Sequence, residues 1–328
     1  MGAIPEQSFT VREAAWHGQG FVLADYPGRD EAMRLAGHDF RIVERPVEVV
    51  GFKKNHPLDG WKALVRTGTT ADQATLHVAQ TTYTVIDNYV MYDFLEALID
   101  QGFLYETGGT MGGGAICYVT LLLNEPVQIT GDDSVTLPYV VGAWSHNGTM
   151  SASARSTSVR AVCENTVSAG EAEASRLGTN FVFRHTKNAM ERINEAREVI
   201  QGVRAQHDIY VEAMEELARI PVTPEQRDLF VSTIIGDRDG LVSRSPVASD
   251  RVKNNVENER AKINATFFGP TIPEAHKLTA YGLHLAGVEY ADHLRSYRSR
   301  DSYVKRTLLQ DSPFKASLRR TIREIVAA

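Results

Sequence analysis

AICYVTLLL, residues 115–123, is an apolar run that follows a glycine-rich segment and precedes the turn residues Asn124, Glu125 and Pro126. A short continuous run of apolar, β-branched and aromatic residues between turn signals is typical of a strand covered on both faces. We therefore predict a buried strand here, and the fold class depends on the elements that surround it.

Strand signals dominate the residues before this run and give way to one helix. Segments 40–44, 47–52, 61–66 and 75–86 have β character, and turn residues separate most of them. The period then changes. Asp87 or Asn88 is a candidate cap, and apolar residues recur at helical spacing at Val90, Met91, Phe94, Leu95 and Leu98. This pattern predicts the order β-β-β-α.

Further strands are predicted after residue 123. Residues 135–144 form a strand that Pro138 confines to a sheet edge or interrupts with a bulge. The pair Asn147-Gly148 predicts a tight turn into a polar strand over 149–162, which leads into a helix near Asn165. Successive strands without regular βαβ alternation indicate an α+β fold with a mostly antiparallel N-terminal sheet.

The second half of the chain is mainly helical. One helix carries a narrow apolar seam, which packs either on another helix of the same chain or on a second subunit. Pro221 ends this helix, and a polar loop is expected near 236–255. The predicted domains are an α+β sheet domain over 1–175 and a mainly helical domain over 176–328. The seam consists of Ile193, Ala196, Ile200, Val203, His207, Tyr210, Met214 and Leu217.

Composition excludes several classes of protein. Apolar residues make up 43% and charged residues 23%, which is ordinary globular usage and excludes a disordered or fibrous chain. Two cysteines are too few for a disulfide framework. No apolar run is long enough to span a membrane, and the N-terminus has no signal-peptide pattern, so we expect a soluble, cytoplasmic protein. The net charge of −6 excludes a uniformly basic nucleic-acid binder.

No catalytic, cofactor or metal motif is found. The glycines of 108–114 lack the Gly-Lys-Ser/Thr of a phosphate loop and precede a strand, so a flexible hairpin loop is expected. Glu289 and His293 would form a metal site only if other ligands converge, and an exposed helix face has the same spacing. A small buried side chain is the preferred interpretation of Cys163. We expect a protein that is not an enzyme.

Local positive charge gives the candidate binding residues. Alternation in the polar strand places hydroxyl side chains and Arg155 on one face, which is suited to a phosphodiester backbone. Arg160, Arg184 and Lys187 add positive charge, so these four residues are the candidate nucleic-acid contacts. The alternative is a solvated face, because glutamates interleave with later cations. Residues 291–328 are also locally basic, with nine Lys or Arg against four Asp or Glu.

Several segments resemble a known family. Trp144-Ser145-His146-Asn147-Gly148, residues 158–166, residues 185–188 and residues 279–293 are similar to the phage/plasmid-like protein family, a domain-of-unknown-function family of phages, prophages and plasmids. The resemblance covers most of the chain, from about Trp16 onward. It implies a mobile-element protein in a bacterial cytoplasm, and it supplies no catalytic residues.

The β-β-β-α order is also similar to that of single-strand annealing proteins of phage recombination. This similarity implies a non-enzymatic homo-oligomer that binds single-stranded nucleic acid, because annealing needs no hydrolysis. Two alternatives stay open. One is a protein–protein interaction or structural phage protein that uses the seam or the 236–255 loop, and the other is an enzyme that acts on nucleic acid.

Overall fold

The computed structural model describes residues 7–11, 20–51, 53–68, 74–160, 165–167, 180–185, 188, 191, 202–236, 250–295 and 313–327. The chain forms two compact units, each assembled from three segments. The first contains residues 1–124, 139–156 and 174–203, and the second contains residues 125–138, 157–173 and 204–328. The predicted domain boundary at 175/176 lies outside the described residues.

The first unit is built on a large, mostly antiparallel sheet. The strands of the sheet follow the order β11-β10-β9-β7-β6-β1-β2, with β12 also paired to β10, and β1 pairs in parallel with β2. The central strand β7 is buried at every position, as the apolar run predicted. The strands are β1 (Ser8–Val11), β2 (Phe21–Leu23), β6 (Phe103–Met111), β7 (Ile116–Leu123), β9 (Val135–Ser145), β10 (Ala152–Arg160), β11 (Asn165–Val167) and β12 (Asn180–Phe183).

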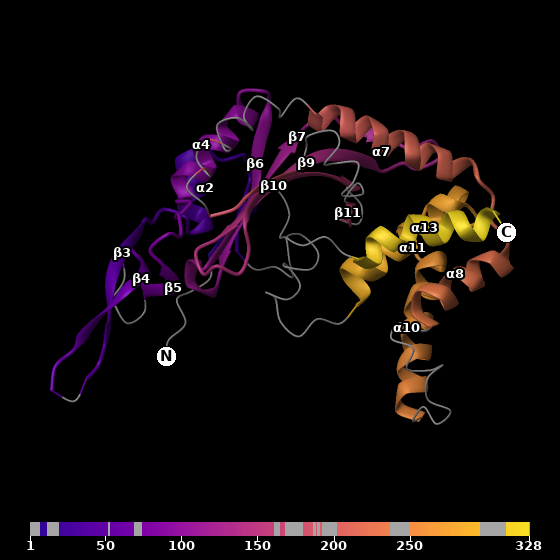
Figure 1. The fold of residues 1–328 in the computed structure, drawn as a ribbon. Helices are drawn as coiled ribbons and strands as arrows, with labels where there is room; N and C mark the ends of the chain where they lie inside the picture. The colour runs from indigo at the N-terminus through magenta and orange to yellow at the C-terminus, as the bar shows by residue number, and fades with distance from the viewer. Residues whose placement is uncertain are drawn as a thin grey trace. The chain divides into compact units, whose positions relative to one another are not determined.

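Two helices cover this sheet and complete its core. Helix α2 (Arg29–Ala36) packs on β1 and β6, and helix α4 (Asn88–Ile99) contributes Met91, Phe94 and Leu95 to the same apolar cluster (Figure 1). Asp87 caps α4 by accepting a hydrogen bond from the Tyr89 backbone N–H, which confirms one of the two predicted caps. Helix α2 was not predicted, because its first two residues, Arg29 and Asp30, follow Pro27 and Gly28 and have the pattern of a turn.

A separate three-stranded antiparallel sheet in the first unit has the order β3-β4-β5. Its strands are β3 (Ile42–Val49), β4 (His56–Arg66) and β5 (Thr75–Gln80). The segments predicted as separate strands over 40–44 and 47–52 therefore join into one strand through Pro46. The register shifts after Pro46, and this irregularity accommodates proline within a strand.

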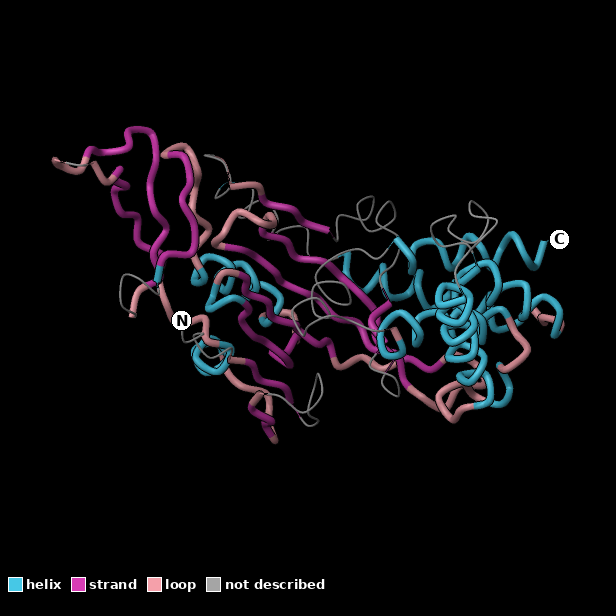
Figure 2. The backbone as a smooth tube through the Cα atoms, turned by 90° about the horizontal axis from the view of Figure 1, so that it is seen from below, coloured by secondary structure: helices cyan, strands magenta, loops and turns pink. Residues whose placement is uncertain are grey.

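The second unit contains most of the helices. Helices α7 (Gly202–Arg219), α8 (Pro224–Gly236), α10 (Asp250–Phe268), α11 (Ala280–Glu289) and α13 (Pro313–Ala327) enclose one apolar core, and a π-helical turn, Tyr290–Leu294, follows α11. Two 3₁₀ turns complete the helical elements, η1 (Gly112–Gly114) in the first unit and η2 (Glu274–His276) in the second. Figure 2 shows helices dominating the chain toward its C-terminal end. None of the described helices has the length and apolar character required to cross a membrane.

The fold class is confirmed, and several boundaries differ from the predictions. The expected helix near Asn165 is wrong, because β11 (Asn165–Val167) pairs antiparallel with the end of β10. Residues 108–111 continue strand β6, so the glycine loop shrinks to η1. Pro138 lies where β9 changes partner, from the short strand β8 (Val127–Gln128) to β7. The expected loop near 236–255 lies largely outside the described residues, and α10 already begins at Asp250.

The described part of the seam faces the interior of the chain. Tyr210, Met214 and Leu217 on α7 are buried in the core of the second unit. Ser158 Oγ and His207 Nδ1 lie 2.9 Å apart, so His207 has a hydrogen-bond partner inside the chain. These residues agree with packing within the chain, and residues 193–201 lie outside the described part.

Candidate functional site

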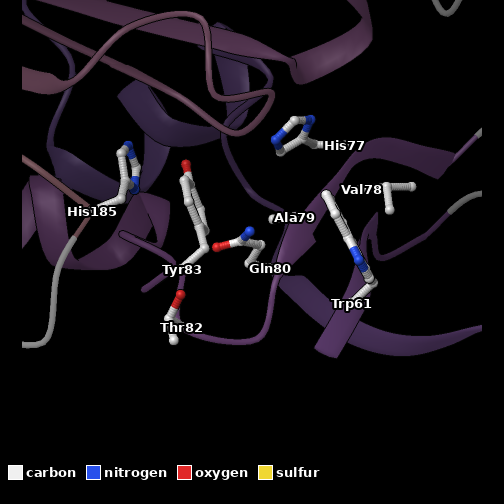
Figure 3. A pocket seen from close by; sticks show the side chains of 8 residues that line it. All are labelled: Trp61, His77, Val78, Ala79, Gln80, Thr82, Tyr83 and His185. Atoms are coloured by element: carbon white, nitrogen blue, oxygen red, sulfur yellow. The ribbon is translucent and has the colours of Figure 1, made fainter. Parts of the chain in front are cut away.

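An open hollow of about 620 Å³ lies along the β3-β4-β5 sheet, within the first unit. Figure 3 shows its side chains, four of which carry aromatic rings: Trp61 and His77 belong to β4 and β5, and Tyr83 and His185 belong to two loops, with Tyr83 and His185 side by side. This volume is in the range of small-molecule sites. The lining residues are Trp61, His77, Val78, Ala79, Gln80, Thr82, Tyr83 and His185.

Strand pairing fixes the floor of the hollow. Trp61 of β4 lies directly opposite Gln80 of β5, and β5 is the last strand of its sheet. Trp61 is 41% exposed and Val78 is 39% exposed, so both present apolar surface to solvent. An exposed tryptophan beside a sheet edge is costly in water, and such apolar surface at a hollow is typical of a binding site.

Backbone hydrogen bonds bring His185 to this sheet from a distant part of the sequence. The Thr84 backbone N–H donates to the His185 carbonyl at 3.3 Å, and His185 Nδ1 lies 2.9 Å from the Thr84 carbonyl. Because a carbonyl only accepts, Nδ1 carries the proton and donates. In the neutral ring, Nε2 is then an acceptor. The pairing also fixes the plane of the imidazole.

Two rings in the hollow are stacked. The Tyr83 and His185 rings lie 4.5 Å apart at 13°, and the His77 ring meets Tyr83 edge-on at 6.1 Å. The Tyr83 hydroxyl and His185 Nε2 are enclosed and have no hydrogen-bond partner. Buried polar atoms without a hydrogen-bond partner are rare in proteins, so two of them in one hollow need an explanation such as a bound ligand.

Electrostatics keep both stacked rings uncharged near neutral pH. Burial raises the pKa of Tyr83 to about 12, so the phenol keeps its proton. Burial lowers the pKa of His185 and outweighs the opposing effect of its backbone hydrogen bonds. Tyr83 and His185 therefore present uncharged, flat rings in the hollow. Such rings can bind a ligand by stacking, and they do not attract it by charge.

The predicted cations Arg155 and Arg184 lie in the first unit. Arg155 is half-buried in β10, opposite Asn180 of β12 in the strand register. Arg184 is exposed, directly after β12, and it is the neighbour of His185 in the hollow. Lys187 lies outside the described residues. Arg184 itself does not line the hollow, and its link to it is the sequence neighbour His185.

Arg160 has a different environment from the one predicted. Its Nε lies 2.6 Å from Asp132 Oδ2 and its Nη2 lies 2.8 Å from Asp132 Oδ1, while Nη1 donates to the Thr271 carbonyl. The Arg160 side chain is 4% exposed. An odd separation within one strand also places it on the opposite face from Arg155. Its guanidinium is therefore a structural group of the second unit and does not face a phosphate backbone.

The other residues considered for chemistry have structural partners. Glu289 accepts a hydrogen bond from Thr271, and Asp292 forms a buried ion pair with Lys315. Among the described residues, no group of three or more His, Cys, Asp or Glu is arranged to hold a metal ion. Cys163 lies outside the described residues. Cys117 is buried, and burial raises the pKa of its thiol.

Sequence patterns do not reveal the aromatic residues of the hollow as a group. The sequence predicts only strands for Trp61 and His77, gives His185 only as added positive charge beside Arg184 and Lys187, and assigns Tyr83 no role. One signal was available, since a tryptophan between Gly60 and Lys62 in a largely polar strand is unlikely to belong to a core. Nothing in the sequence pairs residue 83 with residue 185, because that contact depends on the fold.

Comparisons with known proteins give a family and no named activity. No curated protein matches the chain, and no solved structure matches it. One family model, described as a domain of unknown function (DUF932), matches residues 75–311. That match covers well over half of the chain and includes β5, Tyr83 and His185, so the protein belongs to the DUF932 family.

Proposed function

We propose that this protein is a non-enzymatic nucleic-acid-binding protein of the single-strand annealing or recombination type, encoded by a phage or other mobile element. It acts in the cytoplasm of the bacterial host as a homo-oligomer. The aromatic hollow is the observation that carries the proposal, and the phage or plasmid association rests on the family resemblance of the sequence.

Stacking is the chemistry that supports this function. Proteins that bind single strands without reading sequence place bases on aromatic side chains, because every base has a flat π face. Trp61 offers an exposed indole, and the Tyr83–His185 stack offers a second flat surface in the same hollow. A splayed base fits such a site, whereas a base held inside a duplex does not reach it.

Positive charge next to the hollow supports a phosphate contact. Arg184 is exposed and is covalently adjacent to His185, so a strand whose base enters the hollow passes close to a guanidinium. Arg155 lies on the neighbouring strand β10, and Lys187 follows two residues after His185 in the sequence. In this proposal these cations hold the backbone and leave other bases free to pair. Arg160 is not part of the contact.

Fluorescence titration with single-stranded oligonucleotides tests the proposal. The anisotropy of a dye-labelled oligonucleotide reports binding without using Trp61 as the reporter, so wild type and Trp61→Ala can be compared by the same signal; Trp61 is 41% exposed and lines the hollow. We expect Trp61→Ala to weaken single-strand binding roughly 5- to 150-fold, the range for loss of one stacking contact. Phe268→Ala is the matched control, because Phe268 is 74% exposed and does not line the hollow.

Two results would contradict this function. One is undetectable binding of single-stranded DNA and RNA at low salt. The other is equal loss of binding in the Trp61 and Phe268 variants. Arg184→Gln should weaken binding less at high salt than at low salt, because a phosphate contact releases counterions. Light scattering tests the oligomer, and a monomeric mass would remove that part of the proposal.

A protein–peptide interaction is the second candidate, and the edge position of β5 favours it. Among the described strands, β5 pairs only with β4, so its outer side is open to an added strand. Such a peptide would protect the β5 backbone amides from hydrogen exchange. A stacked nucleotide would leave them unprotected, so exchange measured with each ligand separates the two candidates.

A further inference from the structure

The β3–β4 ribbon extends beyond its own sheet. Strand β5 pairs with β4 only from Trp61 to Val65, whereas β3 and β4 remain paired as far as Val49 and His56. Figure 1 shows the two strands continuing past β5 as a narrow hairpin. We call residues 46–60 the hairpin arm. It has two strands, and no third strand pairs with it among the described strands, since β5 begins to pair only at Trp61.

The end of the hairpin arm, residues 49–58, carries both exposed apolar side chains and lysines. Val49 is 51% exposed and Val50 is 83% exposed, and Lys53, Lys54 and His56 are also exposed. Residues 49–58 contain no Asp or Glu, although the whole chain has a net charge of −6. Two carboxylates of the hairpin arm flank this stretch: Glu48, which accepts a hydrogen bond from Asn55, and Asp59. The tip is therefore a local cationic surface.

Two glycines of the hairpin arm have backbone geometry that fits a ribbon extending away from the sheet. Gly60 has φ +83 at the register shift, a conformation that favours glycine and bends the ribbon at its base. At the turn, a Cβ on Gly51 would lie 2.4 Å from the Lys54 carbonyl oxygen, so the chain closes tightly there. A two-stranded ribbon is only marginally stable alone in water, and a bound partner would stabilise it.

We propose that the hairpin arm enters the major groove of double-stranded DNA, with Lys53 and Lys54 on phosphates and Val49 or Val50 against base edges. This inference rests on the proposed nucleic-acid function and adds a second site for the paired product. The major groove of B-form DNA admits a two-stranded ribbon. Residues 46–49 span about 10 Å at strand rise, which exceeds the groove depth of about 8.5 Å.

The chemistry of the tip favours DNA over the other occupants. Valine side chains contact thymine methyl groups, which are present in the major groove of DNA. The major groove of double-stranded RNA is too narrow and deep for side chains to read. A second copy of the hairpin arm is disfavoured, because it would bring two lysine pairs of like charge together.

Binding to a DNA duplex and to a single strand, measured separately across a salt series, tests the inference. The test variant is Lys53→Gln with Lys54→Gln, two exposed turn positions. The matched control is Arg34→Gln with Arg219→Gln, which removes the same charge from two exposed helix positions. We expect the dependence of log affinity on log salt to fall by about 2 for the duplex, roughly 1 for each lysine.

The result distinguishes this inference from the proposed function. Single-strand affinity should respond to Trp61→Ala and change little in the lysine variant. Wild-type protein that binds single strands and ignores duplexes overturns the hairpin-arm proposal and leaves the proposed function standing. An unchanged duplex salt slope in the lysine variant, or an equal change in the arginine control, also overturns it. So does a loss of oligomer in the lysine variant, which would assign the hairpin arm to contact between copies.

Discussion

Arg160 and Asp132 form a two-point ion pair inside the second unit, with Nε to Oδ2 at 2.6 Å and Nη2 to Oδ1 at 2.8 Å. Tyr281 and Ser134 also donate to the same carboxylate. Burial alone would raise the pKa of Asp132, but the hydrogen bonds from Arg160 and Ser134 outweigh burial and hold it below its usual value. The carboxylate therefore stays charged in the folded protein.

Arg160→Met should destabilise the protein by about 3–5 kcal/mol, because it leaves the Asp132 charge buried without its main partner. Denaturant unfolding monitored by circular dichroism measures the change. Arg320→Met is the control, since Arg320 is exposed on α13 and its replacement should cost no more than about 0.5 kcal/mol. A stable Arg160→Met protein with weakened nucleic-acid binding would instead support a phosphate contact.

His284→Leu should stabilise the second unit. The His284 side chain is buried, and neither ring nitrogen has a hydrogen-bond partner. Burial lowers the pKa of His284 to about 3, so the folded protein keeps the ring neutral. Removing two unsatisfied buried polar atoms should raise the free energy of unfolding by about 1–3 kcal/mol near neutral pH.

The same substitution should reduce the acid sensitivity of the fold. The unfolded chain protonates His284 near its ordinary pKa while the folded ring stays neutral, so the free energy of unfolding falls as pH drops from about 6.5 toward 3. Urea unfolding at pH 7.5 and 5 measures this loss. His276→Leu is the comparison, because His276 Nε2 is bonded to the Thr130 carbonyl and its removal should destabilise. Equal pH dependence in wild type and His284→Leu would disprove the assignment.

Asn88→Ala should disrupt the core of the first unit. Asn88 Oδ1 accepts from Trp144 Nε1 at 2.7 Å and lies 2.8 Å from His146 Nε2, while Nδ2 donates to the His38 and Phe40 carbonyls. Alanine leaves several buried polar groups unpaired, so we expect a loss of at least about 3 kcal/mol. Unfolding and Trp144 emission report the change.

The neighbouring cap residue provides the control for Asn88. Asp87→Ala removes the hydrogen bonds from the Tyr89 and Ile42 backbone N–H groups and an ion pair with exposed Arg41, and it should cost about 1–2 kcal/mol, with a small change in Trp144 emission. A similar loss of unfolding free energy in both variants would show that the Asn88 side-chain hydrogen bonds stabilise the protein no more than the Asp87 helix cap does.

Local sequence patterns were sufficient to predict the central strand β7 and the first long helix, α4. Residues 116–123 are buried at every position, and α4 begins after Asp87. Both were predictable because the spacing of apolar residues and the helix cap depend only on residues close together in the sequence. The expected helix near Asn165 failed for the opposite reason. Antiparallel pairing of Asn165–Val167 with the end of β10 overrides local preference, and no short window of sequence reveals that partner.

The candidate site was harder to predict than the fold. Arg155 and Arg160 have the same charge and lie in one strand, yet Arg160 is paired with Asp132, which lies 28 residues away. The hollow brings together residues 61, 77–83 and 185, and only strand pairing and the Thr84–His185 hydrogen bonds place them side by side. Charge is visible in a sequence, but which charges are already neutralised is decided by the fold.

The segments of the two units alternate along the sequence, and this order affects how the chain folds during its synthesis. Asp132 belongs to the second unit, and its partner Tyr281 follows 149 residues later. At about 5–20 residues per second, a ribosome needs roughly 7–30 seconds to add that length. During this interval the carboxylate and the nearby strand segments lack their helical core. Vectorial folding from the N-terminus therefore cannot finish one unit before the other is begun, and a nascent chain is exposed to chaperones throughout that interval.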